Sequence, residues 1–303
     1  MQYRELDTEQ GILQYGTDAD TVQIVGYRGR DTELAVPAQI AGCAVTCVGK
    51  KAFLSNKVLK QISLPESVIR IDDWAFAYCT RLQKVILPYH RMEIGQGIFK
   101  ECLALEQIVD EGADEREQKT ADIAYLLAAV MSRLDAFYLF DFESAGNNDW
   151  ISQWDNRMMS VMEREDSEGF SKMLLCGEED YGSKENNLDY YMEQRRREKV
   201  RLAMLRLMHD YRLESSVRGK LEAYLMAHIK GRQTEETWRV ILEEYGDELQ
   251  YYRFLTDLGG VNVDNFQAMM EDMGESHTEM KAYLMKYHSE RHKSADAFAA
   301  FEL

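Results

Sequence analysis

The sequence predicts an α/β solenoid of short repeats followed by an all-α domain, and three observations support this prediction. Residues 48–110 repeat with a step of 23 residues, as the column Phe53, Phe76 and Phe99 shows. All three prolines of the 303-residue chain lie at or before Pro88, whereas 14 of the 16 methionines lie after residue 110. A long stretch without Pro and rich in Met, Leu, Glu, Lys and Arg favours helices. The change of composition predicts two domains, 1–110 and 111–303.

Each repeat predicts two short strands and one tight turn. The aligned segments are "VGKKAFLSNKVLKQISLP", "IDDWAFAYCTRLQKVILP" and "IGQGIFKECLALEQIVD". The other apolar columns are Val48, Ile71 and Ile94; Leu59, Leu82 and Leu105; and Ile62, Val85 and Ile108. The pattern L-x-x-I-x-L-P predicts a strand with apolar residues pointing inward, and its Pro ends the ladder. A second strand, as in "VIRI", leads into a helical or 3₁₀ turn that buries the Ala-Phe pair.

Cysteines recur in the same column as Asn56, at Cys79 and Cys102. A small side chain at this point of the turn can meet backbone groups. We therefore expect both cysteines to be buried small residues and not ligands or nucleophiles.

These residues resemble the BspA-type leucine-rich repeat, whose pattern is similar to V-T-x-I-G-x-x-A-F-x-x-C-x-x-L-x-x-I-x-L-P. The preceding segment contains "VQIVGYRG", "LAVPAQIAG" and "VTCVG", and it is similar to the hairpin-rich lead-in of such repeats. The resemblance covers residues 11–109 and implies an α/β leucine-rich-repeat solenoid of about three repeats with an N-terminal β cap. Ile98 replaces the expected alanine, and Asp110 stands where Leu-Pro would continue. The array is therefore expected to end there and to need a cap.

From residue 118 onward the pattern has a helical period. The segment 120–140 is apolar all round, so we expect a buried helix capped by Thr120 that lies across the open end of the repeats. Further helices are predicted at 148–164, 167–176, 187–212, 215–230, 234–245, 247–258, 262–273 and 276–292, with Ser294 capping a last turn. Helix pairs about every 30 residues and the turn-like "LGGVNVDNF" resemble degenerate ankyrin-like repeats. The T-P-L-H motif of that family is missing, so any antiparallel helix-pair array would serve equally well.

Composition argues against several classes of function. The net charge is −17, of which −15 lies in residues 111–303, and such a surface repels the phosphates of nucleic acids. No apolar stretch reaches the roughly 20 residues of a membrane helix. Five cysteines do not make a complete disulfide framework, and "MQYRELDTEQ" has no apolar core behind a basic start. We expect a cytoplasmic protein. The alternative is a secreted or surface protein whose signal peptide has been removed.

Candidate chemical sites are few. His288 and His292 share a helical face at the spacing of a metal pair, but no third ligand is near in sequence, so a solvated helix is the better interpretation. The basic run "EQRRREK" (193–199) directs its arginines three ways, and neighbouring glutamates can pair with them; the alternative is an anion or partner patch. Trp150 and Trp154, four residues apart, are expected in the core. The sequence thus predicts no catalytic residue, no cofactor and no metal.

Three functions remain open. The favoured hypothesis is a non-enzymatic scaffold that binds a protein partner, since repeat arrays present extended surfaces. The alternatives are a cell-surface or secreted recognition protein, and an enzyme with a site in the helical half. The predicted partner-binding residues are the outward strand positions Gln61, Ser63, Lys84, Ile86, Gln107 and Val109. The chain's own helices could equally cover Ile86 and Val109. The partner's identity and the oligomeric state are not predicted.

Overall fold

The computed structural model describes residues 3–112, 117–176, 187–232 and 234–299. The chain packs as two compact units, one of residues 1–159 with 209–212 and one of residues 160–208 with 213–303. The predicted division into domains 1–110 and 111–303 remains a prediction. Within the described ranges, none of the helices has the length and hydropathy that a membrane crossing requires.

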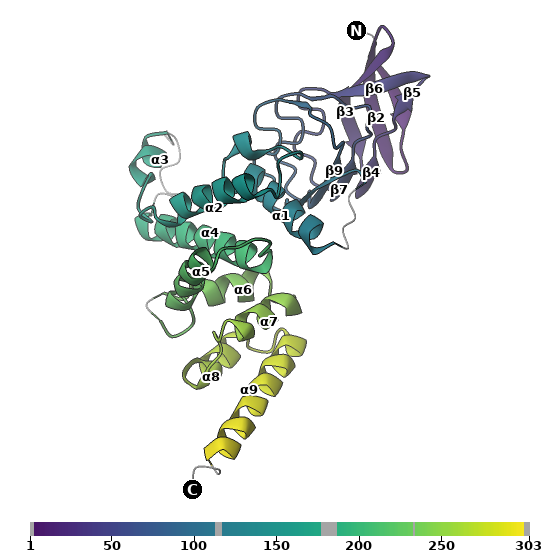
Figure 1. The fold of residues 1–303 in the computed structure, drawn as a ribbon. Coiled ribbons are helices and arrows are strands. Elements are labelled where there is room, and N and C mark those ends of the chain that lie inside the picture. The colour runs from purple at the N-terminus through teal and green to yellow at the C-terminus, as the bar shows by residue number, and fades with distance from the viewer. Residues whose placement is uncertain (1–2, 113–116, 177–186, 233, 300–303) are drawn as a thin grey trace. The chain divides into compact units, whose positions relative to one another are not determined.

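The first unit opens with an antiparallel lead-in and continues as a solenoid (Figure 1). Strands β1 (Tyr3–Asp7), β2 (Gly11–Asp18) and β3 (Thr21–Gly29) form the lead-in, and β5 (Gln39–Ile40) pairs with β6 (Cys43–Val48) as a hairpin. Sheet A has the order β1-β2-β3-β6-β8-β10, with β8 at Arg70–Ile71 and β10 at Glu93–Ile94. Sheet B has the order β11-β9-β7-β4, with β4 at Glu33–Ala35, β7 at Gln61–Ser63, β9 at Lys84–Leu87 and β11 at Gln107–Asp110.

The parallel strands of the two sheets confirm the predicted solenoid. In sheet A, β3, β6, β8 and β10 run parallel, and in sheet B all four strands do. Residues pair at the predicted step of 23, as Ile62 with Val85 and Val85 with Ile108 do. The lead-in strands β3 and β4 therefore complete a turn ahead of the three repeats that the sequence predicted.

A ladder of aromatic rings fills the centre of the solenoid. The ring centroids of Phe53 and Phe76 lie 5.1 Å apart, and those of Phe76 and Phe99 lie 5.5 Å apart. Tyr27 extends the ladder by stacking on Phe53 at 5.8 Å. All three phenylalanines are buried, so the 23-residue column of the sequence is the hydrophobic spine of the fold.

The turns of the repeats use their small-residue column as predicted. Asn56 Oδ1 accepts hydrogen bonds from the backbone N–H groups of Val58 and Leu59, both at 2.9 Å. The buried thiols of Cys79 and Cys102 instead donate to the carbonyls of Phe53 and Phe76, both at 3.1 Å. Each Cys thus links one turn to the turn before it. The prediction that these cysteines are buried small residues is confirmed.

The helix after the repeats is shorter than predicted. Helix α1 spans Gln118–Ser132, so Thr120 lies inside the helix and Glu117, not Thr120, occupies the N-cap. The chain then turns through Asp135, which has a φ of 45°, into the 3₁₀ helix η1 (Phe137–Leu139). The apolar pattern did not reveal this break, because Leu134, Ala136 and the segment 137–140 continue it beyond the end of the helix.

Helix α1 packs against β11, as expected of a cap for the repeats. Helix α2 (Asn148–Met162) secures this arrangement through two buried tryptophans. Trp154 Nε1 donates to the carbonyl of Leu126 at 3.1 Å, and Trp150 Nε1 donates to that of Leu139 at 2.8 Å. The predicted core role of both tryptophans is confirmed.

The second unit consists of the end of α2 and seven further helices among the described residues. They are α3 (Phe170–Cys176), α4 (Leu188–Met208), α5 (Ser215–Ala227), α6 (Glu236–Glu244), α7 (Leu249–Asp257), α8 (Val263–Asp272) and α9 (Thr278–Ala299). These ranges match the predicted helices to within a few residues, except that α9 runs straight through the predicted cap Ser294. The turn after "LGG" is a capping box between Asn262 and Asn265. The ankyrin-like resemblance is not confirmed.

Candidate functional site

The predicted partner-binding residues lie together on the outer face of sheet B. The register places Gln61, Lys84 and Gln107 in one row, and Ser63, Ile86 and Val109 in the next. The first five side chains are half-buried, but Val109 is only 4% exposed. Helix α1 packs on β11, so the chain's own helix covers this end of the face. Of the two alternatives left open by the sequence, cover by the chain itself therefore applies to Val109.

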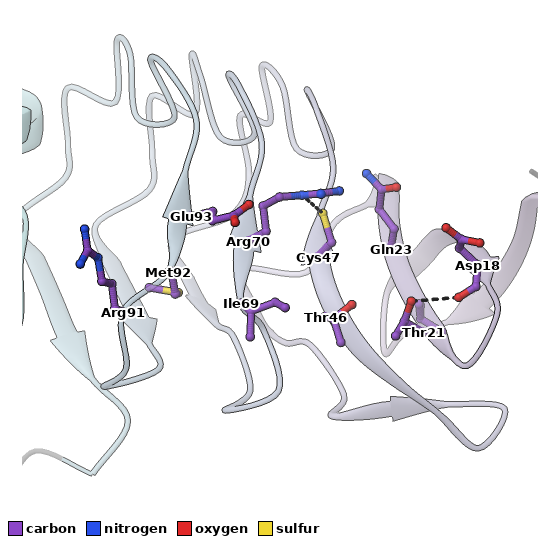
Figure 2. Close-up of a pocket in the computed structure, with 11 residues that line it drawn as sticks. Asp18, Thr21, Gln23, Thr46, Cys47, Ile69, Arg70, Arg91, Met92 and Glu93 are labelled. Atoms are coloured by element: carbon purple, nitrogen blue, oxygen red, sulfur yellow. Dashed lines mark hydrogen bonds between the residues drawn. The ribbon is translucent and has the colours of Figure 1, made fainter.

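A hollow lies over the four parallel strands of sheet A (Figure 2). Its cavity volume is 630 Å³. It is lined by Asp18, Thr21, Val22, Gln23, Thr46, Cys47, Ile69, Arg70, Arg91, Met92 and Glu93. The sheet positions these residues in rows, because strands β6, β8 and β10 contribute equivalent positions 23 residues apart.

A polar network crosses the middle of this hollow. Arg70 Nε lies 3.1 Å from Asp72 Oδ1 and donates to Cys47 Sγ at 3.4 Å. Gln23 Nε2 donates to Asp72 Oδ2 at 3.3 Å. Figure 2 shows the Arg70 side chain extending from β8 toward Cys47 on β6, so the guanidinium links two neighbouring strands. The network fixes the long Arg70 side chain across the floor of the hollow.

The chemistry of the hollow suits recognition better than nucleophilic catalysis. Burial raises the pKa of the Cys47 thiol, and the hydrogen bond from Arg70 offsets only part of that effect. A neutral thiol is a poor nucleophile and a poor metal ligand. Beside the network, Ile69 is 58% exposed, so an apolar side chain stands in water next to a charged pair.

Comparison with known proteins identifies the repeat segment. Residues 43–113 match the family model of the BspA type leucine rich repeat region, with six copies. These residues are a BspA-type leucine-rich repeat region. No curated protein matches the chain.

Several solved structures are similar to the part of the chain that holds the BspA-type region. A leucine-rich repeat protein of T. pallidum is 35% identical, with a TM-score of 0.32, over 35% of this chain and 50% of that one. A leucine-rich cell surface protein of Faecalibacterium prausnitzii A2-165 is 24% identical, with a TM-score of 0.30, over 36% and 30%. A leucine-rich repeat protein of Bacteroides ovatus ATCC 8483 is 23% identical, with a TM-score of 0.31, over 34% and 29%. This chain thus spans half or less of the length of each.

Reasoning from the sequence missed the hollow of the BspA-type region, although a signal for it was present. The hollow's residues also recur at the 23-residue step, in the columns Thr46, Ile69 and Met92 and Cys47, Arg70 and Glu93. Only the outward positions of the L-x-x-I-x-L-P strand were predicted to bind a partner, and those of the second strand of each repeat were not. Ile69 was the informative residue, because it is an apolar side chain in a column that holds Thr46 in the preceding repeat.

Outside the BspA-type region, the basic run of α4 is paired with acids as expected. Arg195 pairs with Glu198 at 3.0 Å, Arg196 with Glu236 at 2.6 Å, and Arg197 with Glu243 and Glu244 at 2.5 and 3.1 Å. Most of these acids come from α6, although the flanking Glu193 also lies 3.6 Å from Arg197. Burial would raise the pKa of Glu244, but Arg201 and Arg197 outweigh it and lower that pKa. The run therefore joins α4 to α6 through ion pairs.

The predicted histidine pair of α9 does not form a described metal site. The ring of His288 stacks on Phe266, with centroids 3.9 Å apart, while the side chain of His292 lies outside the described residues. Among the described residues, no three His, Cys, Asp or Glu side chains gather as metal ligands would.

Proposed function

We propose that the chain is a protein-interaction module, and that its BspA-type region binds a protein partner in the hollow over sheet A. The observation that carries this proposal is Ile69, which is 58% exposed in a cavity of 630 Å³ beside Arg70 and Arg91. Interface centres combine apolar side chains with arginines, whose planar guanidinium groups bind carboxylates and backbone oxygens. An exposed apolar residue between such groups supports a surface that a partner covers.

The proposal is non-enzymatic and needs no cofactor. Cys47 is held as a neutral thiol by burial, and Arg70 is engaged by Asp72. These groups are arranged to hold one another in place, and a rigid, already hydrogen-bonded surface loses little entropy when it binds.

The predicted face on sheet B is the second candidate for the same function. Gln61, Lys84 and Gln107 form a polar row, and Ser63 and Ile86 stand beside it. Parallel rows of half-buried side chains offer a regular surface of hydrogen-bond donors and acceptors. Val109 is excluded from the accessible part of this face because it is buried.

One capture experiment separates the two faces. The full chain would be immobilised as wild type, Ile69→Glu and Ile86→Glu, and used to capture proteins from an extract of the source cells. Val263→Glu is the matched control, since Val263 is also an exposed apolar residue but lies on α8. Loss of a specific partner with Ile69→Glu alone supports the hollow, and loss with Ile86→Glu alone supports sheet B. A partner retained equally by all four proteins, with unchanged circular dichroism spectra, would contradict both.

The cytoplasm is our proposal for the compartment of this module. The described cysteines outside the helical half, Cys43, Cys47, Cys79 and Cys102, are all free thiols. Free thiols persist in reducing compartments. Fractionation of the source cells with an antibody to the chain tests this, and recovery from the surface or the medium would contradict it.

A further inference from the structure

The two sheets of the solenoid end in different surroundings. In sheet B, α1 packs on the last strand, β11. In sheet A, the last strand is β10, which pairs with β8 on one side only. The chain leaves the solenoid for α1 before it can build the strand that would follow β10. The position of that next strand is the subject of our inference.

The inward column of sheet A shows that this position is incompletely filled. Val48 and Ile71 are fully buried in the first two repeats, but the equivalent Ile94 is half-exposed. Each of the earlier residues has a following coil packed on it. Ile94 has none, so part of its side chain remains in contact with water.

The backbone of β10 presents acceptors at the same position. The N–H groups of Glu93 and Gly95 donate to the carbonyls of Ile69 and Ile71, at 2.9 and 2.7 Å. One repeat later, the carbonyls of Met92 and Ile94 occupy the equivalent sites, and no backbone N–H group of the described ranges donates to them. An unpaired strand edge of this kind is a template for another extended chain.

An aromatic hollow lies beside this edge. Its volume is 420 Å³. One side is lined by the loop that leads into β10 and by β10 itself, with Tyr89, Arg91 and Ile94. The other side is lined by residues between 137 and 143, with Phe137 and Tyr138. Tyr89, Phe137 and Tyr138 are all exposed, Tyr138 by 67%. The wall is held in place from behind, because Leu139 is buried and its carbonyl accepts from Trp150. Exposed rings on a fixed wall, rimmed by polar groups, are typical of a contact site.

Arg91 places a positively charged side chain where the aromatic hollow meets the hollow of Figure 2. Both ring nitrogens of His90 face carbonyl oxygens, Nε2 that of Glu66 at 2.9 Å and Nδ1 that of Arg91 at 3.2 Å. The hydrogen bond to the Glu66 carbonyl, and to a smaller extent the one to the Arg91 carbonyl, raises the pKa of His90. Both bonds favour the protonated ring, because a ring nitrogen must carry a proton to donate to a carbonyl oxygen. The Arg91 side chain is exposed and lines both hollows. This guanidinium is complementary to a carboxylate of a ligand.

We propose that the edge of β10 binds an extended segment of a partner protein, which adds to sheet A as its next strand. This inference rests on the proposed function, since it names the form in which the partner is recognised. The N–H groups of the segment donate to the carbonyls of Met92 and Ile94. One apolar side chain of the segment enters the aromatic hollow, and one acidic side chain pairs with Arg91. The mode of binding is β-strand addition, in which main-chain hydrogen bonds supply affinity and pockets supply selectivity.

The test uses a random peptide library displayed on phage and selected against the full chain. We expect selected peptides to carry an apolar residue near an acid. The Kd of the best synthetic peptide would be measured for wild type and for Tyr138→Ala, Arg91→Gln and Tyr3→Ala. Tyr3 is a matched control, because it is also 67% exposed and lies on β1, the opposite edge of sheet A. We expect Tyr138→Ala and Arg91→Gln to weaken binding at least tenfold, and Tyr3→Ala by less than twofold.

Main-chain pairing is tested on the peptide itself. N-methylation of every second residue removes N–H donors from one edge of an extended chain. We expect methylation of one alternate set to weaken binding at least tenfold, and methylation of the other set to leave it nearly unchanged. Equal effects of both sets would overturn strand addition. A library without binders, or binders lost with Tyr3→Ala, would overturn the site.

Two further outcomes separate this inference from the proposed function. A partner that is lost with Ile69→Glu but retained by both Tyr138→Ala and Arg91→Gln would leave the proposed function intact and overturn the edge site. If sedimentation shows a dimer of the chain that Tyr138→Ala dissociates, the occupant is a second copy, and the proposal of a separate partner is wrong.

Discussion

Phe76 stands in the middle of the aromatic ladder, and its replacement by Ala tests whether the ladder holds the solenoid together. The side chain is fully buried and stacks on both Phe53 and Phe99, at 5.1 and 5.5 Å. Phe-to-Ala changes in cores cost about 3–5 kcal/mol, and each aromatic pair contributes about 0.5–1.5 kcal/mol of specific attraction. With a ring on either side and no route for water, the loss should be near the top of that range, about 4–5 kcal/mol.

Phe76→Leu separates the stacking from the burial. Leu keeps most of the apolar contact but neither ring pair, so it should recover all but about 1–3 kcal/mol of the loss. Urea unfolding gives the free energies, and amide hydrogen exchange over residues 71–99 shows whether the effect is local to the repeats. The exposed Tyr138→Ala is the control and should change stability by about 0.5 kcal/mol or less. A cost below about 1 kcal/mol for Phe76→Ala would refute the ladder as the main source of stability.

Three other changes have outcomes that the structure fixes. Asp31 is buried, and its carboxylate accepts hydrogen bonds from Thr8 and Tyr27, at 2.5 and 2.7 Å. Burial alone would raise the pKa of Asp31. These two hydrogen bonds and a third from a backbone N–H group outweigh burial, so the pKa is lowered. Asp31→Asn should therefore cost about 1–3 kcal/mol at pH 7, and thermal unfolding at a series of pH values should show the difference vanish as the pH falls through the folded pKa of the wild type. Asn56→Ala removes the acceptor of two turn N–H groups and should cost about 1–3 kcal/mol in urea unfolding, whereas a change within error would mean that water replaces the amide. Val109→Glu should destabilise the chain by more than about 3 kcal/mol through an unpaired buried charge; equal melting temperatures for this variant and Ile86→Glu would show that α1 does not cover β11.

The solenoid could be predicted from the sequence because the same pattern of apolar residues recurs in each repeat. One apolar column, such as Phe53, Phe76 and Phe99, can arise by chance in a single window, but the same column at a fixed step cannot easily do so. The fourth turn was not predicted because the lead-in builds it from different residues. Tyr27 takes the ring position there, at a spacing of 26 instead of 23, and its hydroxyl binds Asp31. In this coil an aromatic ring still fills the centre of the solenoid, although its residue does not follow the 23-residue spacing.

The helices were predicted closely in existence and less well at their ends. Helix α1 ends at Ser132 because the chain turns at Asp135, a residue with positive φ that no glycine or proline announces. The C-terminal end of α1 matters for the proposed edge site, since the residues after it form the aromatic wall beside β10. An apolar run of the sequence was thus read as one buried helix, although its second half holds exposed rings.

The candidate sites were the least predictable feature, because they depend on how the repeat array ends and not on the repeat pattern itself. A repeat pattern tells which residues face outward, as at Ile86 and Val109, but it does not tell which outward residues another segment covers. Val109 is covered by α1, whereas Ile94, an inward residue by pattern, is left half-exposed. Both departures occur in the last coil, where each residue lacks the neighbour that the next repeat would supply. The end of a short solenoid is therefore where its sequence pattern predicts exposure least well, and it is also where unpaired backbone and uncovered apolar surface gather.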